Sequence, residues 1–254
     1  MAKRVDSAAE YDVPDHDTSV FWKVSYATLV PLIRAAWRLR FTGRENIPKE
    51  GPAILASNHL SFLDHFLFPP ATRRQIYFIS KAEHFQSPIK RSLFRKWGVI
   101  PLKRGKGDTA AMEVSLELLR TGHLFGIYPE GTRSLDGKLH KGRTGVARLA
   151  LLSGAPVIPV AMCGTFEAMP KGKSWPRFPK VEVRIGKPLS FGHLADKVED
   201  RATLRRVTDE IMMAIRDLSG QEYVDEYQDN PEYRARQAKE GAAEGANVPK
   251  NGSS

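Results

Sequence analysis

The segment PAILASNHLSFLDH, residues 52–65, decides how we interpret the fold of the chain. Its apolar run at 53–57 has the length and the bounded form of a buried strand. Polar residues follow directly, and Ser61 is suited to cap a helix that we predict over 61–68. A buried strand that leads through a polar turn into a helix is a building unit of α/β proteins, so we predict that fold class.

The same alternation of apolar runs and helical patterns extends outward from this segment, from residue 41 to about residue 218. Further strands are predicted at 76–80, 99–102, 124–128, 157–161 and 181–185. Further helices are predicted at 83–97, 109–120, 144–152 and 203–218. Strands that alternate with helices favour a sheet covered on both faces, where ligands bind at loops beyond the carboxyl ends of the strands.

Composition divides the 254 residues into a polar tail (1–18), an amphipathic segment (19–40), an α/β domain (41–220) and a largely disordered tail (221–254). Hydrophobic residues make up 41% of the chain, which is enough for a core and excludes a wholly disordered protein. The N-terminus has no apolar run, so we expect no secretory signal. The single cysteine, Cys163, excludes an intrachain disulfide and a zinc site of several thiolates, and we expect a reducing compartment.

An aromatic-rich stripe at helical spacing marks the segment 19–40, and its members are Trp22, Tyr26, Leu29, Ile33 and Trp37. Basic residues interrupt the apolar run, which argues against a transmembrane span, and Pro31 is expected to kink or split the helix. One interpretation is a membrane-docking helix or helix pair in the bilayer interface, which suits tryptophans flanked by basic residues. The other is an ordinary amphipathic helix packed on the domain.

Charge is concentrated in the middle of the chain. The formal net charge is +10, but residues 1–20 carry two basic and five acidic side chains, and residues 221–254 carry four and seven. The remainder, 21–220, therefore holds 33 basic and 17 acidic residues, a net charge of +16. Such a segment favours a polyanionic partner: nucleic acid, an anionic membrane or a phosphorylated small molecule.

His59 and Asp64 form the first candidate site, because both follow the strand predicted at 53–57. A helix capped at Ser61 places Asp64 close enough to reach back to the imidazole. A carboxylate on one ring nitrogen fixes the tautomer and leaves the other nitrogen free as a base. The alternative is a hydrogen-bonded loop histidine and an aspartate that interacts favourably with the helix dipole.

A second candidate site is the segment YPEGTRS, residues 128–134, which again follows a predicted strand. Gly131 permits a tight turn between Glu130 and Thr132, and Arg133 offers a planar group suited to phosphate or carboxylate. The alternative is a strand-ending turn that carries an ordinary surface pair of arginine and glutamate.

Three more cations stand where an anion could bind. Lys103 and Arg104 follow the strand predicted at 99–102 and lie beside two glycines. Lys141 precedes the helix predicted at 144–152, whose N-terminus attracts phosphate. A solvated turn is the ordinary alternative at both places.

Four blocks occur in a fixed order: Asn58-His59-x-x-x-x-Asp64, residues 98–104, residues 128–134 and residues 157–160. This combination resembles the glycerolipid acyltransferase family, most closely the bacterial 1-acyl-sn-glycerol-3-phosphate acyltransferases, over roughly residues 45–190. The first block matches the family's His-x-x-x-x-Asp motif, and Tyr128 stands where Phe is more usual. The resemblance implies a mixed, largely parallel sheet flanked by helices and preceded by an amphipathic N-terminal helical segment.

The resemblance also implies the reaction. His59 takes the proton of an acceptor hydroxyl, and Asp64 orients the imidazole and stabilises its charged form. The hydroxyl then attacks an acyl thioester, acyl-CoA or acyl carrier protein, without an acyl-enzyme and without a metal or cofactor. The expected acceptor is 1-acyl-sn-glycerol 3-phosphate (lysophosphatidic acid) and the product is phosphatidic acid. Glycerol 3-phosphate, another lysophospholipid or a glycolipid stay open as acceptors.

The remaining candidates are assigned to substrate binding by the same resemblance. Arg104 and Arg133 hold the acceptor phosphate, and Lys103 and Lys141 are further candidates for it. Glu130 braces the site or contacts the acceptor, together with Gly131 and Thr132 of its block. The expected location is peripheral, on the cytoplasmic face of the cell membrane, with an anionic membrane surface as partner and no nucleic acid.

Two other classes of function, a nucleic-acid-binding protein and a hydrolase, fit the sequence less well. The basic stretch KGKSWPRFPK, residues 171–180, has the composition of a nucleic-acid contact, but no known nucleic-acid-binding motif accompanies it, and lipid headgroups or coenzyme A phosphates suit it better. A hydrolase requires a nucleophile, but the sequence lacks a Gly-x-Ser-x-Gly motif and Cys163 ends an apolar strand.

Overall fold

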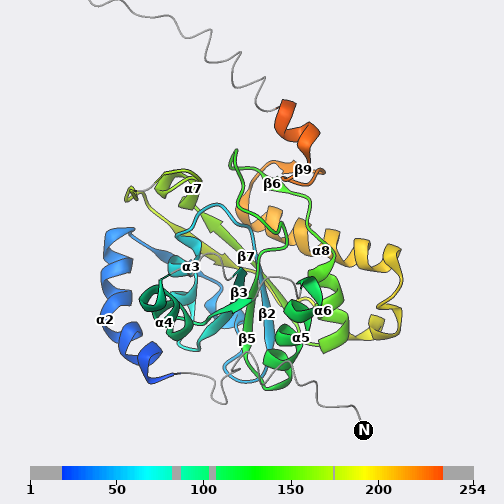
Figure 1. The fold of residues 1–254 in the computed structure, drawn as a ribbon, viewed down its shortest axis with the longest axis horizontal. Helices are drawn as coiled ribbons and strands as arrows, with labels where there is room; N and C mark the ends of the chain where they lie inside the picture. The colour runs from blue at the N-terminus through cyan, green and yellow to red at the C-terminus, as the bar shows by residue number, and fades with distance from the viewer. Residues whose placement is uncertain (1–18, 82–86, 103–106, 174, 237–254) are drawn as a thin grey trace, which may run out of the picture.

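The computed structural model describes residues 19–81, 87–102, 107–173 and 175–236, whose ribbon is coloured in Figure 1. The main sheet consists of β1 (Arg40–Thr42), β2 (Ala53–Ser57), β3 (Ile76–Lys81), β4 (Val99–Leu102), β5 (Leu124–Ile127), β7 (Val157–Cys163) and β8 (Glu182–Ile185). Its order is β1-β8-β7-β2-β5-β3-β4, and all neighbours are parallel except β7 and β8. A mixed, largely parallel sheet is therefore confirmed.

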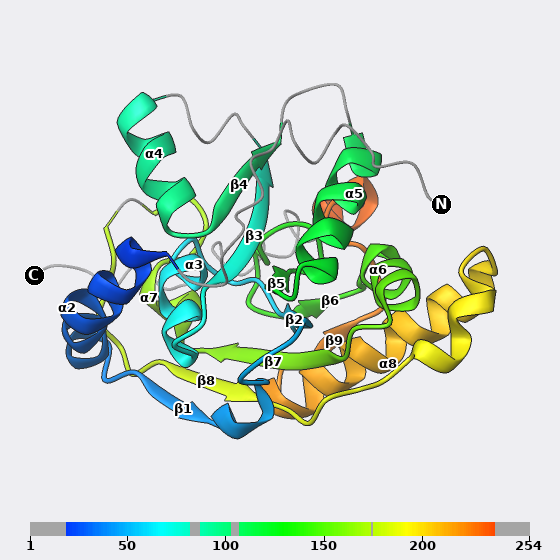
Figure 2. The same ribbon diagram turned by 90° about the horizontal axis from the view of Figure 1, so that it is seen from below.

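The helices are α2 (Val20–Ala36), α3 (Asp64–Leu67), α4 (Pro88–Lys96), α5 (Gly107–Arg120), α6 (Gly145–Ser153), α7 (Thr165–Ala168) and α8 (Arg201–Ser219). Short 3₁₀ turns cover Arg44–Asn46, Pro69–Ala71 and Gly192–Lys197, and residues 231–236 form a last helical turn. Figure 2 shows α5, α6 and α8 on one side of the sheet and α2, α3 and α4 on the other.

The central strand β2 is buried along its whole length. Ile54 and Ala56 belong to the core beneath α5, α6 and α8, while Ala53 and Leu55 belong to the core beneath α3. A strand that packs on both faces needs a continuous apolar run rather than an alternating one. Residues Ala53–Ser57 form such a run, which is why this strand could be predicted from the sequence.

The predicted bounds of an element are correct where its apolar run has clear ends, and they are wrong where a turn precedes the element. Strands β2 and β4 have the predicted bounds. The helix predicted from 61 begins at Asp64, because the backbone N–H groups of Leu60 and Ser61 are used in hydrogen bonds to the Asp64 carboxylate. Three strands were not predicted: the edge strand β1, and β6 (Leu139–His140) and β9 (Tyr223–Val224), which form a small separate sheet.

The N-terminal segment forms one continuous helix, α2, that contains Pro31. Trp22 is fully buried, donates its indole N–H to the carbonyl of Arg73 and packs edge-on against Trp97. The helix therefore packs on the domain, while Val20 and Val24 on its outer face stay 75% and 57% exposed. None of the helices in the described ranges is long and apolar enough to cross a bilayer.

Residues 221–236 differ from the expected disordered tail. They contain β9, which pairs with β6, and the helical turn 231–236. Gln221 donates to the carbonyl of Gly137, and the carboxamide oxygen of Gln228 accepts the N–H of Leu135. Composition could not reveal this order, because it comes from hydrogen bonds to a loop some ninety residues earlier in the chain.

Candidate active site

The loops that leave β2 and β5 meet at the carboxyl edge of the sheet. The two strands are parallel neighbours, so His59 and Glu130 emerge side by side. The backbone N–H of Ser134 donates to the carbonyl of His59 at 2.8 Å and joins the two loops. The two predicted candidate segments therefore form a single site.

His59 and Asp64 are in direct contact. Nδ1 of His59 lies 2.8 Å from Oδ2 of Asp64, which also accepts the backbone N–H groups of Leu60 (2.8 Å) and Ser61 (2.9 Å). The Asp64 side chain is fully buried, whereas that of His59 is 12% exposed. Because a carboxylate oxygen accepts, Nδ1 carries the proton in the neutral ring and Nε2 is left unprotonated. The arrangement can act as a general base toward a solvent-accessible substrate.

An aromatic group supports the imidazole. The ring of Tyr128 stacks on His59 with centroids 3.9 Å apart and planes 14° apart, and Phe78 stacks behind Tyr128 at 5.7 Å. His65 packs edge-on against both His59 and Tyr128. Burial, with a further contribution from Asp64, raises the pKa of Tyr128 well above its usual value, so its hydroxyl stays protonated. Neither His65 nor Phe78 lies in a motif, so the sequence does not predict that they support the imidazole.

Glu130 points inward and is 2% exposed. Its Oε2 accepts the backbone N–H of His59 and its Oε1 accepts that of His140, both at 3.0 Å. Burial raises the pKa of Glu130 to about 8, although the two hydrogen bonds partly oppose the shift. The geometry is that of a brace for the backbone of His59. It is not that of the surface pair with Arg133 considered as an alternative, since no ion pair joins them in the described chain.

The rest of the EGTR turn faces outward. Gly131 has a φ of +73°, a left-handed conformation that favours glycine, and it is exposed. Thr132 and Arg133 are partly exposed beside it. Within the part of the chain that the structure describes, no carboxylate pairs with the Arg133 guanidinium. Its charge therefore stays available at the mouth of the site.

Lys171 and Arg234 carry further positive charge near Arg133. Burial, and then the charges of Arg133 and Arg234, lower the pKa of Lys171. Lys171 follows Met169, whose carbonyl accepts the hydroxyl of Ser61 at 2.7 Å, so its loop is tied to the residues just after His59. Lys171 lies in the basic stretch 171–180, whereas Arg234 lies in the segment predicted to be a disordered tail, so its place near the site could not be predicted.

The other predicted cations are placed differently. The ammonium group of Lys141 lies 3.0 Å from a carboxylate oxygen of Asp225, so its charge is already paired. Lys103 and Arg104, the next residues after β4 in the sequence, lie outside the described residues. Among the described residues, no group of three or more His, Cys, Asp or Glu side chains is suited to hold a metal ion.

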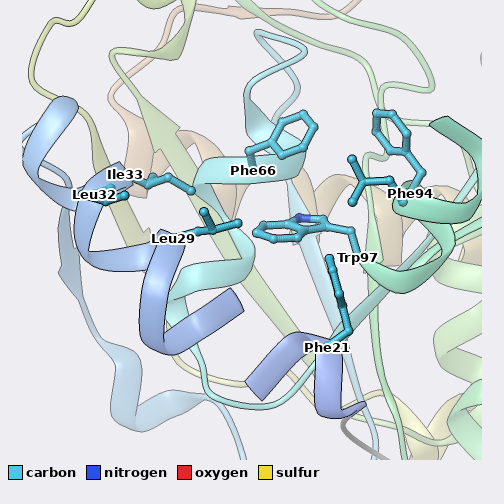
Figure 3. Close-up of a pocket in the computed structure, with 8 residues that line it drawn as sticks. Phe21, Leu29, Leu32, Ile33, Phe66, Phe94 and Trp97 are labelled. Atoms are coloured by element: carbon cyan, nitrogen blue, oxygen red, sulfur yellow. The ribbon is translucent and has the colours of Figure 1, made fainter. Parts of the chain in front are cut away.

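An apolar pocket of about 240 Å³ lies between α2, α3 and α4. It is lined by Phe21, Leu29, Leu32, Ile33, Phe66, Leu93, Phe94 and Trp97. Figure 3 shows Trp97 between Phe66 and Phe21, with the side chains of α2 across from it. Ring contacts connect the pocket wall to the site: Phe66 packs against Phe62, and Phe62 packs against His65. The pocket is built from three separate helices, which explains why the sequence did not reveal it.

Comparisons with known proteins show which family the chain resembles. Residues 38–163, which include both loops, match the family model described as Acyltransferase. A chloroplastic 1-acyl-sn-glycerol-3-phosphate acyltransferase of Brassica napus is 36% identical over 165 residues, 63% of this chain and 47% of that protein. The 1-acyl-sn-glycerol-3-phosphate acyltransferase of Bacillus subtilis is 29% identical over 61% of this chain and 76% of its own. The chain spans about half the length of the plant relatives that it matches.

A solved structure shares the fold. The crystal structure of the 1-acyl-sn-glycerophosphate acyltransferase from Thermotoga maritima is similar with a TM-score of 0.60 and 26% identity, covering 77% of this chain and 80% of that one. The range that matches the family model holds His59, Asp64 and the EGTR turn, and the solved structure has a similar fold. The chain belongs to the acyltransferase family.

Proposed function

We propose that this protein transfers an acyl chain from acyl-CoA or acyl carrier protein to the sn-2 hydroxyl of 1-acyl-sn-glycerol 3-phosphate, which gives phosphatidic acid. The observation that carries the proposal is the His59–Asp64 pair, with an accessible imidazole on a buried carboxylate at the edge of the sheet. The names of the relatives support the choice of acceptor. Another acceptor used within the same family is the alternative.

The reaction needs a base because a hydroxyl is a poor nucleophile at neutral pH. Nε2 of His59 accepts the hydroxyl proton as the oxygen attacks the thioester carbonyl, and Asp64 stabilises the imidazolium that forms. The tetrahedral intermediate then collapses and expels the thiolate of the donor, which takes up the proton that Nε2 of His59 had accepted, so that the neutral base is restored. General base catalysis of this kind contributes roughly 10²–10⁴-fold.

Binding of the acceptor phosphate is assigned to Arg133, together with Lys171 and Arg234. Lys171 lies close enough to Arg133 and to Arg234 for both charges to lower its pKa, and Ser134, the residue after Arg133, donates its backbone N–H to the His59 carbonyl. A phosphate held there fixes the hydroxyl against the thioester, and such positioning accounts for a large part of the barrier reduction in two-substrate reactions. Lys141 is left out of this group because Asp225 already pairs with it.

An acyl chain requires an apolar surface, and the pocket between α2, α3 and α4 offers one. All side chains that line it are apolar, and Phe66 connects it through Phe62 and His65 to the imidazole. The pocket is therefore proposed to accommodate hydrocarbon from a substrate.

Docking at a membrane surface is part of the proposal, because the acceptor is a lipid. Val20 and Val24 on α2 and Trp175 and Phe178 on the neighbouring loop are exposed apolar residues. Trp37, which follows α2, packs against Phe178 and so joins the two elements. An apolar face of this kind beside basic residues suits the interface of an anionic bilayer.

The direct test is to replace the base. His59→Ala is expected to lower the rate of acyl transfer by about 10²–10⁴-fold, while the thermal midpoint and vesicle binding stay close to wild type. His193→Ala is the matched control, because His193 is exposed in the 3₁₀ turn Gly192–Lys197. A His59→Ala protein with near wild-type activity would show that the mechanism is wrong.

A hydrolase is disfavoured by the structure as well as by the sequence. Burial raises the pKa of the Cys163 thiol, which makes it a poorer nucleophile at neutral pH. A hydrolase would release free fatty acid from the thioester at the same rate with and without a hydroxyl acceptor.

A further inference from the structure

Asp136 lies at the centre of a buried group of polar side chains beside the candidate active site. Its carboxylate accepts hydrogen bonds from the hydroxyl of Ser134 (2.9 Å), Nε2 of His140 (3.0 Å) and the hydroxyl of Tyr233 (2.5 Å). The His140 side chain is fully buried and Tyr233 is 5% exposed. Burial alone raises the pKa of Asp136, but the hydrogen bonds from His140, Tyr233 and the backbone N–H of Lys138 outweigh it and lower the pKa well below its usual value. Asp136 is therefore an ionised carboxylate at neutral pH.

Two hydrogen-bonded paths lead from Asp136 to the two backbone polar atoms of His59. Ser134 bonds Asp136 through its hydroxyl and donates its backbone N–H to the His59 carbonyl at 2.8 Å. His140 bonds Asp136 through its ring and donates its backbone N–H to Oε1 of Glu130, while Oε2 of Glu130 accepts the N–H of His59. Both sides of the His59 residue are therefore held by groups that converge on Asp136.

Tyr233 brings the C-terminal segment into this network. It lies in the helical turn 231–236, beyond the residues 38–163 that match the family model. Its ring packs edge-on against His140, with centroids 5.0 Å apart. Gln228 of the same segment fixes the backbone of Leu135, next to Asp136. The segment is thus attached at more than one point to the loop that carries Asp136.

We propose that Asp136 and Tyr233 are positioning residues for the catalytic base, with Tyr233 acting through Asp136. Neither residue touches the imidazole, so both act on the placement of His59 and not on the chemistry itself. A base must lie within hydrogen-bond reach of the proton that it removes, and a displacement of about 1 Å can cost on the order of 10²-fold in rate. The inference rests on the proposed function, since it needs His59 as the base.

Tyr233→Phe is the most sensitive variant, because it removes one hydroxyl and keeps the ring on His140. We expect kcat to fall about tenfold, while the KM values for donor and acceptor and the thermal midpoint stay close to wild type. Tyr227→Phe is the matched control, because Tyr227 is 36% exposed on the same segment and its ring faces Arg143 rather than Asp136. Asp136→Asn is expected to lower kcat further, by on the order of 10²-fold.

The double variant tests the order of action. If Tyr233 acts through Asp136, Tyr233→Phe adds no further loss of kcat to Asp136→Asn. A multiplicative loss, a KM effect without a kcat effect, or a Tyr233→Phe protein that matches Tyr227→Phe would overturn the inference. If Asp136→Asn does not fold, the comparison of Tyr233→Phe with Tyr227→Phe decides alone. Full activity of His59→Ala would instead contradict the proposed function, so the two failures are distinguishable.

Discussion

Glu130 shows how single residues maintain the site. Sequence analysis placed it beside the acceptor or in a bracing role, and the structure buries it under two backbone N–H groups. The Glu130 carboxyl group loses contact with water in this position, and in return it holds the backbone of His59. Burial disfavours the charged form of Glu130 and raises its pKa to about 8.

This pKa predicts how stability depends on pH. Between pH 4.5 and pH 8 the folded state binds the Glu130 proton more tightly than the unfolded state does, so the free energy of unfolding falls as pH rises through this window. Over this window the pKa difference of Glu130 lowers the free energy of unfolding by on the order of 5 kcal/mol. Urea unfolding at several pH values is expected to show this slope in the wild type and its loss in Glu130→Gln. Glu167→Gln, at an exposed glutamate, is expected to keep it.

Lys171 gives a second prediction for a single residue. Lys171→Met removes one cation from the group that includes Arg133 and Arg234, and a charge-assisted hydrogen bond contributes about 1.5–3 kcal/mol. The KM for the phosphorylated acceptor is therefore expected to rise by roughly 10- to 100-fold, and the KM for the thioester to stay unchanged. Steady-state kinetics with each substrate varied measures both. An equal effect of Lys173→Met, in the same loop, would contradict the assignment.

Strands β3 and β5 together form the support for the catalytic ring. Phe78 of β3 occupies the space above Gly126 of β5, where a Cβ atom would lie 2.2 Å from the Phe78 ring. Phe78 in turn stacks behind Tyr128, which stacks on His59. The absence of a side chain at one position of β5 therefore determines where the aromatic group lies.

Gly126→Ala tests this arrangement. The added methyl group must displace Phe78, and overpacking of a core of this kind costs about 1–3 kcal/mol. We expect a lower thermal midpoint and a lower kcat than in the wild type. Gly145→Ala at the start of α6, where a Cβ atom meets nothing within 4 Å, is the control and is expected to leave both unchanged. Normal kcat in Gly126→Ala would mean that the aromatic support is not needed.

Helix α2 has a buried face and an exposed face, and the structure confirms only that the helix packs on the domain. Trp22 packs against Trp97, which places α2 on the domain. Val20 and Val24 are exposed apolar side chains on the other face, and docking of this face at a membrane stays a prediction. The sequence pattern could not separate the two, because an aromatic stripe can serve a core and an interface equally well.

The outer face of α2 predicts an effect on vesicle binding. Val24→Asp is expected to weaken binding to phosphatidylglycerol-containing vesicles by at least about tenfold, because a charge replaces a 57% exposed apolar side chain at the proposed interface. Co-sedimentation measures this. Leu152→Asp, at a 46% exposed leucine on α6, is the control. Equal loss in both variants would show that α2 has no special role in binding.

At the scale of the whole molecule, the sequence predicted what depends on local patterns. The apolar runs of β2 and β4 are continuous and sharply bounded, and His59 and Asp64 lie five residues apart, so both strands and the dyad were predictable. The polar edge strand β1 has no such pattern. Asp136 and Tyr233 meet across 97 residues, and the pocket joins three helices, so their roles depend on the folded chain.

Acceptor-dependent acyl transfer tests the central claim most directly. The purified protein would be given oleoyl-CoA with lysophosphatidic acid, glycerol 3-phosphate or lysophosphatidylcholine, and the lipid products identified by mass spectrometry. We predict phosphatidic acid from lysophosphatidic acid as the main product, with release of coenzyme A that depends on this acceptor and on His59. Release of coenzyme A at the same rate without acceptor, or with His59 replaced by alanine, would contradict the account.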